Sequence, residues 1–519
     1  MNEEKTKLSL RKTDWRNFGI ISLFLLLILL WVSPYSPLYR YIFHTDLVCY
    51  KVMAKGLLQG KIPYRDLFDH KGPVTYFIYA IGFLLPGNLN IGAFVLCWII
   101  NCVAFIYAYK CNRLFFGSEV SLLATMLILL VNALTIFNIF LTGSMPDNFA
   151  VAPLMISTYL FLKETMALRP DPEDPDGKRN EKSVQPFRAI RNRSMLIIGL
   201  MCGLVFMTKL NICLFFFVFI GAYLLWLLVK KKVVVFLQNT GCFLLGIALV
   251  FLPCVLFLAF HHALSDFIDV YIRFNLGYSK DGLSILFWTS TSIPVPAKIS
   301  MTILLLLSVL VTVLKWKGMD RQKRILTVLS YLSFIVLSLP DNIVYFYIVF
   351  VPLYVMVFGV LSEFLLALTD GKTNAVQLSV ILIAVIAVTL GMQFYICGYI
   401  KPDTSQKEQT LLAFQKAHPD ATCMSFFSTT VIGYYEYCTG IPDFRVFYQP
   451  PIATDELVEE QISEVVERLP DTIVYIGVGD DAYDSAMQAF IEKNGYVLYS
   501  AFAEDYDAEY FYVRKEFAV

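Results

Sequence analysis

Charged residues are scarce in this sequence: Asp, Glu, Lys and Arg make up 16% of its 519 residues. Soluble domains carry about a quarter of such residues. Because 57% of the chain is hydrophobic, an ordinary soluble protein is excluded. Apolar runs long enough to cross a hydrocarbon core of about 30 Å recur down to about residue 398. The composition therefore predicts a polytopic α-helical membrane protein.

Motifs for metal binding and for nucleotide phosphates are also missing. None of the 11 cysteines forms a CxxC or Cys/His cluster with metal-ligand spacing, and no Gly-rich phosphate-binding loop occurs. Most cysteines lie in apolar segments, where they serve as small hydrophobic side chains. Cys423 and Cys438 lie in the C-terminal part, and the sequence leaves open whether they form a disulfide.

The cleavage site of a signal peptide is missing as well. The first apolar run begins near Phe18 and has no small-x-small pattern before Pro34. The run is also long for the apolar region of a signal peptide. We therefore interpret it as a retained transmembrane span.

Net charge changes sign along the chain. The first 400 residues carry 34 Lys or Arg against 21 Asp or Glu, whereas residues 401–519 carry 8 against 21. This predicts a transmembrane domain over residues 1–399, with an outer loop over 35–73 that bears interfacial helices, and a soluble domain over 400–519. Strand patterns in the second, among them residues 444–450, alternate with helix patterns, which predicts a small α/β domain with a mixed sheet. Its acidity argues against binding to nucleic acid.

Basic clusters predict the orientation of the spans, because Lys and Arg near span ends favour the cytoplasmic side. The leader is basic, and so are the segments near Lys110, from Lys163 to Arg193, at Lys232, and from Lys315 to Arg324. The apolar segment Val74–Leu85 would reach only about 18 Å as a helix. If it is interfacial or re-entrant, every basic cluster is cytoplasmic. This predicts a multi-pass cell-membrane protein with about eleven transmembrane helices, a cytoplasmic N-terminus and an extracytoplasmic C-terminal domain.

The first outer loop begins with a helical pattern. Apolar residues from Leu47 onward follow helical spacing, while Lys51 and Lys55 line another face. We expect an interfacial helix with these lysines at the level of the lipid headgroups and with Thr45 or Asp46 as its N-terminal cap. A helix cap and headgroup contacts would by themselves account for these residues.

A denser set of charges follows in the same loop. The stretch "KIPYRDLFDHKGP" places five titratable side chains within seven positions: Arg65, Asp66, Asp69, His70 and Lys71. Fixed cations neutralise a phosphate, and a carboxylate accepts the proton of a hydroxyl, so this mixture fits a site that handles both groups.

This loop resembles that of the GT-C superfamily of polytopic glycosyltransferases, in particular the protein O-mannosyltransferase and aminoarabinose transferase group. Bacterial members often carry a loop that ends in "DHKGP" or "KPP", as Asp69–Pro73 does here. The similarity continues over most of the chain, in "GSMPDNFAVAP" at Asp147, "GLVFMTKLN" at Lys209 and the aromatic run "YFYIVFVP". A soluble tail outside the membrane also fits. In the aromatic run, Tyr345 and Phe346 stand where related sequences often have His-Tyr, which leaves the role of that histidine without a counterpart.

The resemblance implies a mannosyltransferase-like enzyme of the cell envelope, a hexosyl- or pentosyltransferase. It would transfer a sugar from a polyprenyl-phosphate carrier to an extracytoplasmic glycan, lipid or protein. Asp46 would be the general base or organise the site, and Lys71 would contact the lipid phosphate. Asp147 would be the second acid, near the acceptor or in the hydrogen-bond network of the site. The substrate-binding residues would be Arg65, Asp66, Asp69, His70, Lys71, Lys209, Arg273 and Tyr345. Paired acids suit either a divalent cation or a proton, so no cofactor is assigned.

Other interpretations stay open. Lys209 would also fit a lysine that extends to the surface, Tyr345 an aromatic belt, and Arg273 a solvated loop. A transporter or flippase of lipid-linked saccharides would bind the same headgroups, although it should carry more charges within its spans. A polymerase or ligase of surface polysaccharide would share the outer-face geometry but use a lipid diphosphate. A silent scaffold would tolerate Asp46→Asn.

Overall fold

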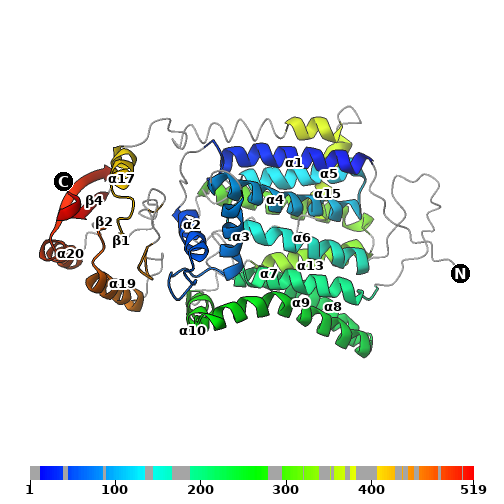
Figure 1. Ribbon diagram of the computed structural model, residues 1–519. Coiled ribbons are helices and arrows are strands. Elements are labelled where there is room, and N and C mark those ends of the chain that lie inside the picture. The colour runs from blue at the N-terminus through cyan, green and yellow to red at the C-terminus, as the bar shows by residue number, and fades with distance from the viewer. Residues whose placement is uncertain are drawn as a thin grey trace. The chain divides into compact units, whose positions relative to one another are not determined.

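The structure is a computed structural model of the whole chain (Figure 1). It describes residues 12–38, 45–85, 89–134, 144–165, 188–278, 295–319, 321–337, 351, 356–368, 374–381, 406–426, 435, 442–448, 455–476, 481–504 and 507–518.

The chain divides into two compact units. The first unit comprises Met1–Ser33, Val95–Leu252 and Asp281–Gln393, and the second comprises Pro34–Phe94, Pro253–Lys280 and Phe394–Val519. The charged outer loop and the C-terminal segment thus belong to the same unit. The predicted boundary near residue 400 stays a prediction.

The first unit is helical, and Figure 1 shows its long helices running side by side. Its helices are α1 (Lys12–Val32), α5 (Ser118–Leu134), α6 (Pro146–Thr165), α7 (Asn192–Phe206), α8 (Leu214–Val229), α12 (Val295–Lys315), α13 (Arg321–Leu337) and α15 (Val357–Leu368), with 3-10 turns η2 (Leu210–Cys213) and η4 (Trp316–Gly318). Two further helices, α4 (Leu89–Arg113) and α9 (Val233–Phe260), begin in one unit and end in the other.

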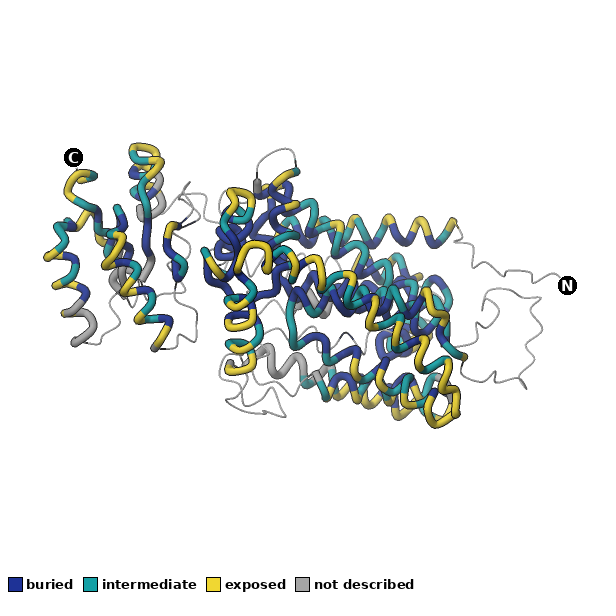
Figure 2. The backbone as a smooth tube through the Cα atoms, turned by 60° about the horizontal axis from the view of Figure 1, so that its bottom comes forward, coloured by how far each residue is buried: buried dark blue, intermediate teal, exposed yellow. Residues whose placement is uncertain are grey.

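Four helical segments in the described part of the chain are long and apolar enough to cross a bilayer. They are Lys12–Trp31, Asn90–Arg113, Leu210–Val229 and Val233–Phe260. Buried and exposed positions alternate along these helices (Figure 2), and α9 exposes large apolar side chains such as Leu244 and Leu249. This is the pattern of helices that pack on one side and face lipid on the other. The total of about eleven spans stays a prediction.

Helices α7 and α9 pack through glycines. A Cβ atom added at Gly199 would lie 2.1 Å from the carbonyl oxygen of Phe243, and one added at Gly246 would lie 2.2 Å from that of Leu196. Only glycine allows backbones to approach this closely, which is a common device between membrane helices.

The second unit combines short helices with a sheet. Its helices are α2 (Thr45–Leu58), α3 (Pro73–Leu84), α10 (Leu264–Phe267), the π-helical η3 (Ile268–Phe274), α11 (Asn275–Tyr278), α17 (Gln406–Ala417), α19 (Asp455–Arg468), α20 (Asp481–Lys493) and the turn η7 (Lys515–Phe517). The strands are β1 (Cys423–Phe426), β2 (Thr472–Ile476), β3 (Tyr496–Glu504) and β4 (Asp507–Arg514).

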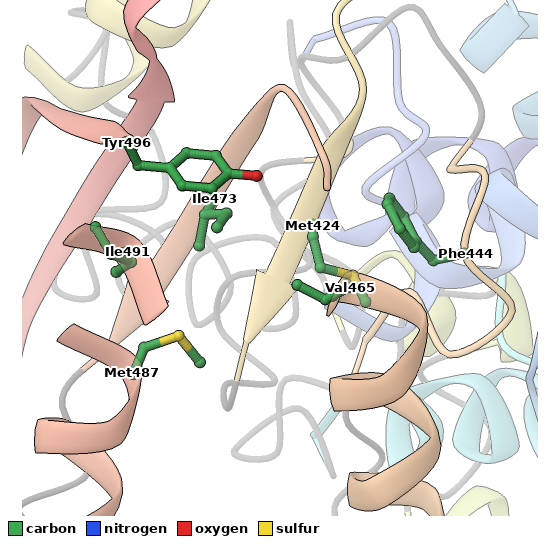
Figure 3. Close-up of a cluster of buried hydrophobic side chains, with 7 residues drawn as sticks. All are labelled: Met424, Phe444, Val465, Ile473, Met487, Ile491 and Tyr496. Atoms are coloured by element: carbon green, nitrogen blue, oxygen red, sulfur yellow. The ribbon is translucent and has the colours of Figure 1, made fainter. Parts of the chain in front are cut away.

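The sheet is mixed, with strand order β1-β2-β4-β3. β1 and β2 are parallel, with Cys423 opposite Thr472, whereas β4 pairs antiparallel with both β2 and β3. Helices α19 and α20 cover its apolar side chains, and seven buried residues form the core shown in Figure 3: Met424, Phe444, Val465, Ile473, Met487, Ile491 and Tyr496.

Two local expectations need correction, and one helix was not predicted. The strand predicted over 444–450 does not form in the described residues 442–448, which make successive bends. The reason is that the amides of Arg445 and Val446 donate to the Glu464 carboxylate of α19 instead of to a neighbouring strand. Helix α17 had no predicted counterpart. Helix α2 lies where it was expected, but Lys51 is buried rather than on a headgroup-facing surface.

Candidate functional site

Arg65 and Asp66 build the turn that opens the charged loop. The Asp66 carboxylate accepts from the Ile62 amide at 2.7 Å and from the Arg65 guanidinium at 2.7 and 2.8 Å. Burial opposes ionisation of Asp66, but the bonds from Arg65 and Ile62 outweigh it and lower its pKa. Tyr64, next to this pair, has a positive φ of 72° and is buried. The strained turn thus has its own stabilising ion pair, while Arg65 also donates to the His261 carbonyl at 2.6 Å.

Asp69 is the buried centre of the loop, with 1% of its surface exposed. Its two oxygens accept from different tyrosines: Tyr76 Oη lies 2.7 Å away and Tyr448 Oη 3.0 Å away. Burial raises the pKa of Asp69, although Lys71 and both hydroxyls act in the opposite direction. A buried carboxylate needs such donors, because an ion without partners is costly in the interior.

Lys71 is held by its main chain. The Lys71 carbonyl accepts from Tyr64 Oη at 2.7 Å and from Tyr76 Oη at 3.1 Å. The ammonium group donates to Nε2 of His70, and the residue is 9% exposed. The His70 carbonyl accepts from Asn275 of α11 at 2.7 Å. A compact cation is therefore placed in a nearly closed environment.

Asp46 joins this cluster from α2, where it lies in the first helical turn as predicted. Burial raises the pKa values of Asp69 and Tyr448, and the charge of Asp46 adds a smaller contribution in the same direction to both. The second unit thus brings together Asp46, Asp69, His70 and Lys71.

Asp147 and Lys209 form a buried ion pair in the first unit. Asp147 lies in the first turn of α6, is 2% exposed, and accepts from Lys209 Nζ at 2.7 Å. The lysine therefore bonds to an acid instead of extending to the surface. Its partner's second oxygen, Oδ2, is buried with no hydrogen-bond partner among the described residues. Asp147 thus has one carboxylate oxygen paired with Lys209 and one buried oxygen without a donor among the described residues.

Two residues predicted to bind substrate, Arg273 and Tyr345, are not among the residues described above. Arg273 lies in η3 with a side chain that is 74% exposed, and it pairs with Asp269 one helical turn away. Such an arrangement is typical of a solvated helix face. Tyr345 lies outside the described residues.

The charge pattern of the sequence did not predict several residues that the structure places in or next to the cluster. Tyr64, Tyr76 and Tyr448 supply its hydroxyl donors, and Arg445 contacts the same loop. Tyr448 is far away in the sequence and lies in no recognisable motif, so no sequence signal indicated it. Among the described residues, no three His, Cys, Asp or Glu side chains lie together as metal ligands would.

Comparison with solved structures shows that the chain shares a known fold. The crystal structure of ArnT from Cupriavidus metallidurans bound to undecaprenyl phosphate matches 98% of this chain and 100% of its own, with a TM-score of 0.60 and 13% identity. The same protein in the apo state matches 97% and 98%, with a TM-score of 0.57 and 11% identity. No protein-family profile and no curated protein sequence matches the chain. The chain has the GT-C fold, as the resemblance of its first outer loop predicted.

Proposed function

We propose that this protein is an integral-membrane glycosyltransferase that transfers a sugar from a polyprenyl-phosphate carrier to an extracytoplasmic acceptor. The observation that carries the proposal is the pair of buried residues Asp69 and Lys71, with His70 bonded to Lys71 and Asp46 in the same unit. The shared fold with a protein that binds undecaprenyl phosphate supports a lipid phosphate as the donor group.

In the proposed reaction the acceptor oxygen forms a bond to the anomeric carbon while the bond from that carbon to the phosphate oxygen breaks. The proton of the acceptor hydroxyl moves to Asp46, and polyprenyl phosphate leaves. Negative charge grows on the departing phosphate, and a fixed cation at Lys71 stabilises that charge. Arg65 has its guanidinium engaged with Asp66 and is a weaker candidate for the same task.

The pair of Asp147 and Lys209 is proposed for the acceptor. Lys209 occupies one carboxylate oxygen, and the buried Oδ2 of Asp147 lacks a donor that an acceptor hydroxyl or amine would supply on binding. An acceptor bound in this way would be oriented without losing its own nucleophilic oxygen. The panel of donors in the experiment below distinguishes a hexose from a pentose as the transferred sugar.

The experiment is sugar transfer by purified protein from a panel of polyprenyl-monophosphate sugars. Loss of a general base lowers turnover by about 100-fold or more, so Asp46→Asn should do so. Lys71→Ala should lower kcat/KM by about 100-fold, because the leaving phosphate loses its cation. The matched controls are Asp420→Asn and Lys416→Ala, at exposed positions of the second unit, which should transfer like wild type.

Binding of the carrier without turnover, unchanged by Asp46→Asn, would contradict the enzyme and indicate a transporter or flippase. Turnover only with a lipid diphosphate would indicate a polymerase or ligase.

A further inference from the structure

Residues 442–448 lie between two parts of the second unit, and we call this segment the strap. On one side it meets helix α19 and the core of the sheet, and on the other side it meets the charged loop, residues 61–72. The contacts of the strap connect the C-terminal part of the chain to the cation of the donor site.

The strap is anchored in the core of the sheet. Phe444 is 1% exposed and packs with the buried cluster that contains Met424 and Val465 (Figure 3). The Glu464 carboxylate accepts the two amides that follow Phe444, each at 3.1 Å, and Gln461 donates to the Val446 carbonyl at 3.0 Å. Helix α19 therefore holds the strap in one conformation.

The opposite side of the strap binds the charged loop through main-chain atoms. The Phe68 amide donates to the Arg445 carbonyl at 2.8 Å, and Arg445 Nε donates to the Tyr64 carbonyl at 2.7 Å. The Arg445 guanidinium also lies 5.6 Å from the centre of the Phe68 ring and is fixed by Glu460. At the start of the strap, Lys61 bonds to the Pro442 carbonyl and to Asp443.

Tyr448 carries the connection to the buried carboxylate. Its hydroxyl donates to Oδ1 of Asp69, while Oδ2 accepts from Tyr76. Tyr76 also donates to the Lys71 carbonyl, which lies two residues after Asp69. Loss of the Tyr448 hydroxyl would leave a buried carboxyl oxygen of Asp69 short of a hydrogen-bond partner, and the loop would have to move to recover one.

We infer that the strap positions the donor-phosphate site, with Tyr448 and Asp69 as positioning residues that hold the charged loop so that Lys71 meets the carrier phosphate. The inference rests on the proposed function for the identity of the ligand. It extends that function by making α19 and the strap part of donor binding.

The test compares Tyr448→Phe with wild type in the full-length purified protein. The first readout is hydrogen–deuterium exchange of peptides over residues 61–72, which should become faster because the loop loses a fixed point. The second readout is the affinity for undecaprenyl phosphate, which should fall by about threefold to tenfold when one hydrogen bond is lost. The KM for the acceptor should stay the same.

Tyr496→Phe is the matched control. Tyr496 is also buried, and its hydroxyl donates to the Pro470 carbonyl within the sheet domain, with no contact to the charged loop. This variant reports general loss of stability and should leave both readouts at wild-type values. Asp69→Asn is the second variant, and it should weaken carrier binding at least as much as Tyr448→Phe.

Equal affinity for undecaprenyl phosphate in wild type, Tyr448→Phe and Asp69→Asn would overturn the inference. An equal loss in Tyr496→Phe would overturn it too, because the effect would then be general. If wild type binds no undecaprenyl phosphate and transfers no sugar, the proposed function fails, and the role in donor binding fails with it. Failure of the inference alone shows as a wild-type protein that binds the carrier and variants that bind it equally well.

Discussion

At the scale of single residues, Asp66 and Asp69 are carboxylates three positions apart with opposite environments. Asp66 is half-buried in a turn with an arginine, and its pKa is lowered, whereas burial raises the pKa of Asp69. Folding therefore shifts Asp66 toward its ionised form and Asp69 toward its protonated form. The pH dependence of stability separates these two cases.

We predict that Asp69 makes the folded state less stable as pH rises. Between its ordinary pKa of 3.8 and its raised pKa, the folded protein binds more protons than the unfolded chain, so the free energy of unfolding falls with pH. The slope reaches about 1.4 kcal/mol per pH unit for one such group. Thermal unfolding in detergent from pH 4 to 8 should show wild type losing stability relative to Asp69→Asn over this window.

Asp66→Asn tests a carboxylate whose pKa is lowered by folding instead of raised. The stability due to a lowered pKa is present above 3.8 and is lost only as pH falls through the lowered value. The difference between wild type and Asp66→Asn should therefore be constant from pH 4 to 8. A difference between wild type and Asp69→Asn that is equally flat would contradict the assignment for Asp69.

At the scale of elements, the contact of α7 with α9 depends on the absence of side chains. Gly199→Ala would place a Cβ atom 2.1 Å from the Phe243 carbonyl oxygen, which forces the two helices apart. We expect a loss of about 1–3 kcal/mol in the free energy of unfolding, as for other overpacked sites. Thermal unfolding of the purified protein measures it.

The control for this substitution is Gly221→Ala in α8, where an added Cβ would meet nothing within 4 Å. Alanine is the better helix former by about 0.5–1 kcal/mol, so this variant should equal or exceed wild type in stability. If both variants lose stability equally, close packing of α7 on α9 is not the cause.

At the scale of the whole molecule, the prediction concerns topology. An odd number of spans with a cytoplasmic N-terminus would leave the C-terminal sheet domain outside. We predict that Glu467→Cys, in α19, reacts with a membrane-impermeant maleimide in intact cells of a cysteine-depleted variant. Lys230→Cys, in a cluster predicted to be cytoplasmic, should react only after permeabilisation. Both positions are exposed, and the reverse labelling pattern would contradict the predicted orientation.

Much of the fold was predictable because its signals are local. Apolar length indicates membrane helices, and alternating strand and helix patterns indicated the mixture of strands and helices that follows residue 400. The strand predicted over residues 444–450 was wrong for a physical reason. Their β-branched and aromatic side chains suit a strand, but the amides of Arg445 and Val446 donate to the Glu464 carboxylate. A side chain from a later helix leaves no local signal.

The sequence alone determined the class of the protein, the placement of Asp46 at a helix start, and the charged stretch up to Lys71, because composition, periodicity and short motifs are local properties. Only the tertiary structure decided that Asp69 is buried between Tyr76 and Tyr448, and that Asp147 pairs with Lys209. These partners are distant in sequence, and a hydrogen bond requires atoms within about 3 Å. Such proximity arises only when the chain has folded.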